Sequence, residues 1–96
     1  MHIAIASFAL KDGVTEEAMV AASDRFETEF VQQQRGIIRR IVVKDDAGYA
    51  DIVLFEDAAA IEQVMEAEQT SEACAALFSL MGEGSHRLFE VIKTYG

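Results

Sequence analysis

The strand-like segments of this chain are apolar on both faces, and this feature limits how the chain can fold. Successive side chains of a strand point to opposite faces. In the segment His2–Leu10, one face carries Ile3 and Ile5, and the opposite face carries Ala4, Ala6 and Phe8. A sheet with water on one side alternates apolar and polar residues instead. The pattern therefore predicts a sheet that is covered on both of its faces.

Two further segments repeat this pattern and form a predicted hairpin. Ile37–Lys44 is rich in β-branched residues, and Tyr49–Phe55 is almost entirely apolar. The intervening run Asp45-Asp46-Ala47-Gly48 has the composition of a hairpin loop. We predict a last strand over His86–Tyr95, which again places apolar residues on both faces.

Helix signals separate the strands. Thr15 is a good N-cap, and Glu16 and Glu17 follow it at the positive end of the helix dipole. This predicts a helix that ends at Arg35-Gly36. Asp57 caps a second helix, whose pattern breaks around Glu68–Ser71 and restarts as a short helix capped by Thr70 or Ser71 and ending at Gly82 or Gly84.

The resulting order is β-α-β-β-α-β, which predicts a ferredoxin-like α+β fold with a four-stranded antiparallel sheet in one domain, residues 1–96. The helices can cover only one face of such a sheet. An uncovered apolar face would exceed the few hundred Å² that monomers usually expose. We therefore expect a homodimer that packs the second faces of two sheets together.

Composition excludes several classes of function. The chain carries 17 acidic and 8 basic residues, a net charge of −9, which disfavours nucleic-acid partners and anionic membranes. No apolar run approaches the ~20 residues of a membrane span, and the N-terminus lacks a signal-peptide pattern, so we expect a cytoplasmic protein. The single cysteine excludes an internal disulfide, and no metal or cofactor motif is present, so we expect neither metal nor cofactor.

The element order, the run Ala50–Asp57 from strand to helix and the recapping run Ser71-Glu72-Ala73-Cys74 resemble the dimeric α/β-barrel superfamily. Within it, the chain resembles the antibiotic-biosynthesis-monooxygenase-like group. The resemblance covers almost all of the sequence and implies a dimer that forms an α/β barrel. It also implies a pocket between sheet and helices in each subunit.

The superfamily includes cofactor-free oxygenases of polyphenols, haem-degrading enzymes and other small enzymes, so the resemblance does not select one reaction. Its oxygenase branch tends to place an asparagine and a tryptophan four residues apart on the third strand. The matching positions here are Asp51 and Phe55, and the chain contains no Asn and no Trp.

Asp51 is the leading candidate for chemistry, because aspartate is unusual in the middle of an apolar strand. It could accept a proton from a phenolic or enolic substrate, or it could form a structural ion pair with Arg39 or Arg40. His86 is a second candidate acid or base, although a lone histidine is more often structural. Cys74 lies on an apolar helical stripe and is expected in the core.

The candidate substrate-binding residues are Phe55 as a stacking wall, with Phe26, Tyr49 and Arg40. Two functions remain open at this point. One is a small-molecule protein that, if it is catalytic, carries out proton transfer or cofactor-independent oxidation of an aromatic or polyketide-like compound. The other is a non-catalytic binding or structural homodimer whose charged residues hold the fold together.

Overall fold

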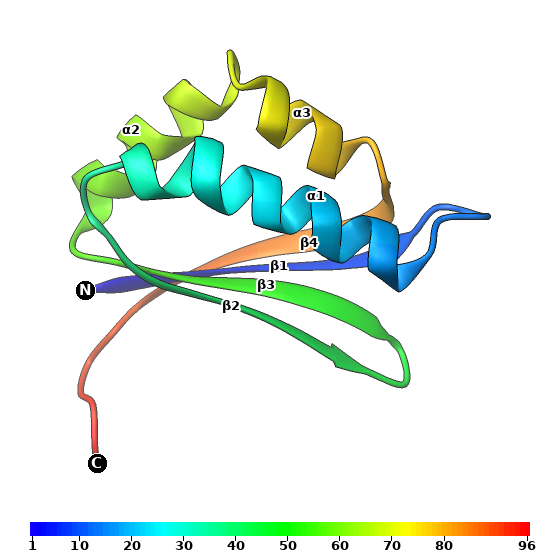
Figure 1. Cartoon of the computed structure of the whole chain (residues 1–96). Coiled ribbons are helices and arrows are strands. Elements are labelled where there is room, and N and C mark those ends of the chain that lie inside the picture. The colour runs from blue at the N-terminus through cyan, green and yellow to red at the C-terminus, as the bar shows by residue number, and fades with distance from the viewer.

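A four-stranded antiparallel sheet carries three helices on one of its faces (Figure 1). The computed structural model describes all 96 residues and confirms the predicted ferredoxin-like α+β fold, with the second helix divided in two. The strand order is β2-β3-β1-β4. The elements are β1 (His2–Leu10), α1 (Glu16–Glu29), η1 (Val31–Gln33), β2 (Ile37–Asp45), β3 (Gly48–Phe55), α2 (Ala58–Glu68), α3 (Glu72–Phe78) and β4 (Met81–Glu90).

Side-chain caps begin all three α-helices at or beside the positions expected from the sequence. Thr15 accepts a hydrogen bond from the Ala18 N–H at 3.1 Å. The Asp57 carboxylate accepts one from the helix α2 backbone at 2.9 Å, and Ser71 accepts one from helix α3 at 3.1 Å. These contacts satisfy backbone donors that have no partner inside the helix. Of the two alternatives for the third cap, the structure selects Ser71.

The first helix ends earlier than predicted. Helix α1 stops at Glu29, and the chain tightens into the 3₁₀ turn η1 before it reaches Gly36. Phe30 and Val31 are both buried, although consecutive residues of an α-helix lie about 100° apart around its axis. A tighter turn brings both side chains into the core. Gly36 then turns the chain into β2 with a φ of +89°.

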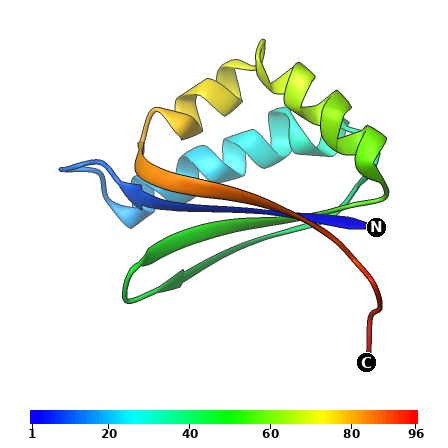
Figure 2. The same ribbon diagram turned by 180° about the vertical axis from the view of Figure 1, so that it is seen from behind.

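The last strand is also shifted from its predicted place, His86–Tyr95. Strand β4 begins at Met81, because it pairs with β1 from Leu10 back to His2. The Val91 N–H still donates to the Met1 carbonyl, but β1 offers no residues beyond that point. Residues 91–96 therefore leave the sheet, and their end lies on the side away from the helices (Figure 2). Gly82 and Gly84, expected as helix stops, belong to this strand.

The core lies between the sheet and the helices and contains thirteen buried apolar residues. Ala4, Phe8 and Phe55 contribute from the sheet, and Met19 and Leu77 are among the most deeply buried residues of the helices. We call the sheet face that points away from the helices the outer face; its apolar residues include Ile3, Ile5, Ile41, Val43, Ile52, Leu54 and Phe89. No helix of the chain is long and apolar enough to cross a membrane.

Gly36→Ala tests the packing of the β2 entrance against helix α2. A Cβ at this position would overlap the Ala60 side chain, whereas Gly13, which also has a positive φ, has open space around it. We expect Gly13→Ala to lower the free energy of unfolding by about 1 kcal/mol, from backbone strain alone. Gly36→Ala should cost at least ~1 kcal/mol more, because overlap adds to the strain. Urea denaturation measures both; equal losses would contradict the close contact.

Candidate functional site

A cavity of about 110 Å³ lies between the sheet and the helices. Its floor includes the small side chains of Ala4 and Ala6 on β1, which leave space beneath the helices. Most of its lining is apolar, but four polar side chains reach it: Arg40, Asp51, Glu68 and His86. We call this the inner cavity. Its lining, apolar with a few converging polar groups, is typical of small-molecule sites.

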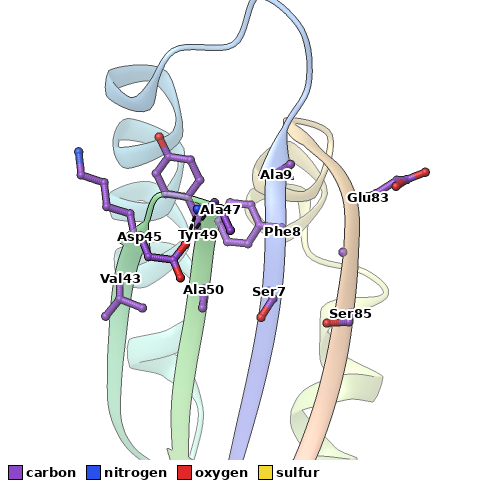
Figure 3. A pocket seen from close by; sticks show the side chains of 13 residues that line it. Ser7, Phe8, Ala9, Val43, Asp45, Ala47, Tyr49, Ala50, Glu83 and Ser85 are labelled. Atoms are coloured by element: carbon purple, nitrogen blue, oxygen red, sulfur yellow. Dashed lines mark hydrogen bonds between the residues drawn. The ribbon is translucent and has the colours of Figure 1, made fainter.

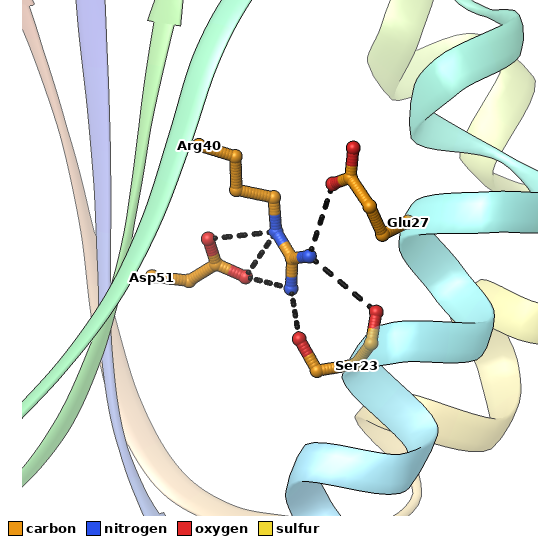
Figure 4. A network of polar contacts seen from close by, with 4 residues as sticks. All are labelled: Ser23, Glu27, Arg40 and Asp51. Atoms are coloured by element: carbon orange, nitrogen blue, oxygen red, sulfur yellow. Dashed lines mark hydrogen bonds and ion pairs between the residues drawn. The ribbon is translucent and has the colours of Figure 1, made fainter.

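Arg40 and Asp51 form an ion pair on the wall of the inner cavity (Figure 4). They project from the neighbouring strands β2 and β3 toward the helices. The Arg40 Nε lies 3.0 Å from each carboxylate oxygen of Asp51, and Nη2 lies 2.8 Å from Oδ2. The side chains are 7% and 12% exposed, so the pair is largely removed from water. Such planar, charge-assisted contacts are strong and directional.

The same guanidinium also binds helix α1. Its Nη2 donates to the Ser23 hydroxyl at 2.7 Å, and its Nη1 faces the Glu27 carboxylate at 3.4 Å. The Phe26 ring lies 5.0 Å from the guanidinium carbon. Arg40 therefore connects β2, β3 and α1 at one point. Of the two alternative partners for Asp51, the structure selects Arg40, because Arg39 projects from the outer face.

Glu68 is the polar cavity residue that the sequence analysis missed. It is the last residue of α2 and reaches the inner cavity beside Met65. Burial raises the pKa of the Glu68 carboxyl above its usual value, and the negative charge of Asp51 raises it further. A hydrogen bond with the Cys74 thiol and the charge of Arg40 act in the opposite direction. One signal was available: Glu68 continues the helical spacing of Ile61, Val64 and Met65.

Cys74 is a core residue, as expected, with 2% of its surface exposed. Burial raises the pKa of its thiol to about 12, and the neighbouring Glu68 carboxyl acts in the same direction. The group is therefore a protonated thiol at neutral pH. Because the thiolate is the reactive form of cysteine, Cys74 is a hydrogen-bond partner of Glu68 rather than a nucleophile.

The structure brings five of the six sequence-derived candidates to the inner cavity. Asp51, Arg40, Phe26 and Phe55 line its inner part. His86 reaches it from the exposed strand β4, opposite Ala6 of β1. Met65 and Phe78 also line the cavity while remaining 48% and 49% exposed, so we place its opening between α2, α3 and β4.

Tyr49 lies elsewhere, at the hairpin end of the sheet. Its ring stacks on Phe8 at 5.6 Å, and its hydroxyl donates to Glu16 at 3.1 Å. Glu16 also accepts a hydrogen bond from Lys44 at 2.8 Å. These contacts fasten the hairpin to the start of α1. Tyr49 does not line the inner cavity.

A second hollow of about 540 Å³ lies at this hairpin end and is open to the outside (Figure 3). Small side chains of the outer face, including Ser7, Ala9, Ala50 and Ser85, form much of its lining. It is larger than the inner cavity, but it contains no cluster of buried polar groups. It therefore lies on the side of the sheet that no helix covers. The chain contains no group of three or more His, Cys, Asp or Glu residues that could hold a metal ion.

Solved structures with the same fold support the resemblance found in the sequence. SnoaB, a cofactor-independent oxygenase from Streptomyces nogalater, is 18% identical, with a TM-score of 0.78 over 97% of this chain and 94% of its own. A protein described as antibiotic biosynthesis monooxygenase is 16% identical, with a TM-score of 0.63 over 97% and 100%.

A MhuD mutant, crystallised with two manganese protoporphyrin IX molecules per active site, is 16% identical, with a TM-score of 0.68 over 100% of this chain and 99% of its own. No family model matches the sequence, and no curated protein matches it. At these low identities the likeness concerns the fold and not the reaction. This chain has the ferredoxin-like fold of the antibiotic-biosynthesis-monooxygenase-like proteins.

Proposed function

We propose that the chain binds a single-ring aromatic compound with an ionisable hydroxyl group in the inner cavity. The observation that carries this proposal is an apolar cavity into which four polar side chains converge. Its volume of about 110 Å³ is near that of an engineered apolar cavity of roughly 150 Å³ that accepts benzene. Pockets for drug-sized ligands are larger, at roughly 300–1,000 Å³. A fused polyketide would have to extend through the opening near Met65 and Phe78.

If the protein is an enzyme, the reaction is proton transfer or cofactor-independent oxidation of this aromatic compound. The fold shared with a cofactor-independent oxygenase supports this class of reaction. Asp51 is a proposed contact for the ligand hydroxyl: a carboxylate has about four acceptor positions, and Arg40 occupies three. His86 is a proposed second acid or base near the opening, and Phe26 and Phe55 are proposed walls for the ring.

Ala6→Leu tests whether the inner cavity is the binding site. The added three carbon atoms would fill the cavity above β1, between Asp51 and His86 on the neighbouring strands, and the substitution replaces no polar residue. With 4-nitrophenol as the probe, we expect calorimetric titration to show at least a tenfold loss of affinity relative to the wild type. The variant should retain its circular dichroism spectrum, since larger side chains are tolerated where space exists. Ala75→Leu, on the exposed side of α3, is the matched control. Unchanged affinity in Ala6→Leu would exclude the inner cavity.

The second candidate function is a non-catalytic homodimer in which the ion pair is structural. The extensive bonding of Arg40 favours this alternative, because it explains Asp51 without any ligand. A buried cation that loses its partner is strongly destabilising.

Asp51→Ala tests whether the ion pair is structural. We expect a loss of about 3 kcal/mol in unfolding free energy, since the Arg40 guanidinium is left almost buried and without its main partner. Glu29→Ala, which removes the exposed partner of Arg25, should cost at most ~0.5 kcal/mol. Denaturant unfolding measures both. A fully stable Asp51→Ala protein that no longer binds 4-nitrophenol would assign Asp51 to the ligand and refute its structural role.

We also propose that two copies of the chain pack their outer faces together. The single chain leaves Ile41, Val43 and Phe89 on this face between 37% and 45% exposed. No helix covers them, and a second identical sheet would remove them from water. Burial of this face contributes about 25 cal/mol per Å² of apolar surface.

Ile52→Lys tests the dimer. Ile52 lies opposite Ile5 on β1 and Ile41 on β2, near the middle of the outer face. A charge there should convert the dimer to a folded monomer, detected by native mass spectrometry at micromolar concentration with circular dichroism unchanged. Val20→Lys, on the exposed surface of α1, should remain dimeric. A monomeric wild-type chain would refute the proposal.

A further inference from the structure

We propose that Glu68 is the group that accepts the proton of the bound hydroxyl compound in the inner cavity. This inference rests on the proposed function, since it names the proton acceptor for the ligand class given there. It also differs from the sequence-derived expectation, in which Asp51 had that role. The two carboxylates reach the same cavity but have different partners.

Asp51 is occupied by Arg40. Three of the guanidinium-to-carboxylate contacts are 3.0 Å or shorter, and they hold both oxygens of Asp51. The pair is also fixed from the far side by Ser23 and Glu27. A proton on Asp51 would disrupt this network at its centre. Asp51 is therefore held in place by Arg40 and is suited to orienting a ligand hydroxyl.

Glu68 has no such partner. It takes part in none of the ion pairs of the chain, and its side-chain hydrogen bond is with the Cys74 thiol, a weak donor. Burial and the charge of Asp51 favour its neutral form and raise its pKa. A carboxylate whose pKa is raised toward neutrality is a more effective general base than one at its usual value.

Charged and titratable groups on β2, β3, β4, α1 and α3 surround Glu68 or its neighbours. Asp51 on β3 raises the pKa of Glu68, whereas Arg40 on β2 and the Cys74 thiol on α3 lower it. His86 on β4 lines the same cavity, and Glu27 on α1 contacts Arg40.

The proposed step moves one proton and one negative charge. The ligand O–H bond breaks, an O–H bond forms on the Glu68 carboxylate, and the electron pair stays on the ligand oxygen as a phenolate or enolate. The total charge of the cavity is unchanged, because Glu68 becomes neutral as the ligand becomes an anion. Arg40 supplies positive charge on the same cavity wall. No electron is transferred in this step.

The test uses 4-nitrophenol, whose absorption moves to longer wavelength as its hydroxyl gives up the proton, with wild type, Glu68→Gln and Glu66→Gln. We expect wild type to bind the probe with this shift, and to bind it less tightly as the pH falls through the raised pKa of Glu68. Glu68→Gln should lose the shift and this pH step, with affinity reduced about tenfold, since a hydrogen bond to a charged group is lost.

Glu66, exposed on the same helix, provides the matched control and should behave as wild type. The variant His86→Gln shows whether a change of probe affinity with pH comes from the histidine and not from Glu68. If wild type and Glu68→Gln show the same spectral shift and pH step, the role of Glu68 is refuted while the binding function stands. If wild type does not bind the probe, the proposed ligand class is refuted and the role of Glu68 is refuted with it.

The free protein offers a second measurement, independent of the probe. A group with a raised pKa binds its proton more tightly in the folded state, so its contribution to stability is present at low pH and is lost as the pH rises through the folded pKa. Glu68→Gln stays neutral at every pH. We expect the unfolding free energy of Glu68→Gln to increase relative to that of wild type as the pH rises from 4 to 8. A difference that does not change with pH would refute the proposal.

Discussion

The ion pair of Arg40 and Asp51 is the interaction on which the rest of the interior depends. A guanidinium taken out of water must find partners for its charge and its N–H groups. Arg40 finds them on β3 and on helix α1, so the electrostatic requirement of one side chain sets the position of two strands and a helix. The inner cavity lies against this group. Arg40 and Asp51 supply part of its polar lining, and Glu68 and His86 supply the rest.

The outer face imposes the second constraint. The four-stranded sheet carries helices on one face only and has apolar side chains on the other, and no helix or strand of the structure covers them. The two faces thus serve different purposes: one holds the core and the inner cavity, and the other is available for association. The separation allows a dimer to form without any change at the polar cluster.

Much of the fold followed from local signals. The caps at Thr15 and Asp57 and the hairpin loop are read from a few neighbouring residues, whose preferences depend little on the remainder of the chain. The predicted ends of α1 and β4 were wrong because they depend on distant partners. The end of α1 depends on how Phe30 and Val31 pack into the core, and the ends of β4 depend on the length of β1. Asp51, Arg40 and His86 were identified as candidates, but the sequence could not choose between Arg39 and Arg40. That choice depends on the β-bulge near the start of β2.

The floor of the inner cavity has a consequence for how such a protein can diverge. Ala4 and Ala6 on β1 set much of its depth, whereas the polar groups stand on β2, β3, β4 and α2. The volume of the cavity and its polar character are therefore encoded on different elements. Exchanges among small residues on this one strand change the space in the cavity without replacing any of its charged residues. A lineage with this arrangement can change the volume of its cavity by single mutations while its polar groups keep their elements.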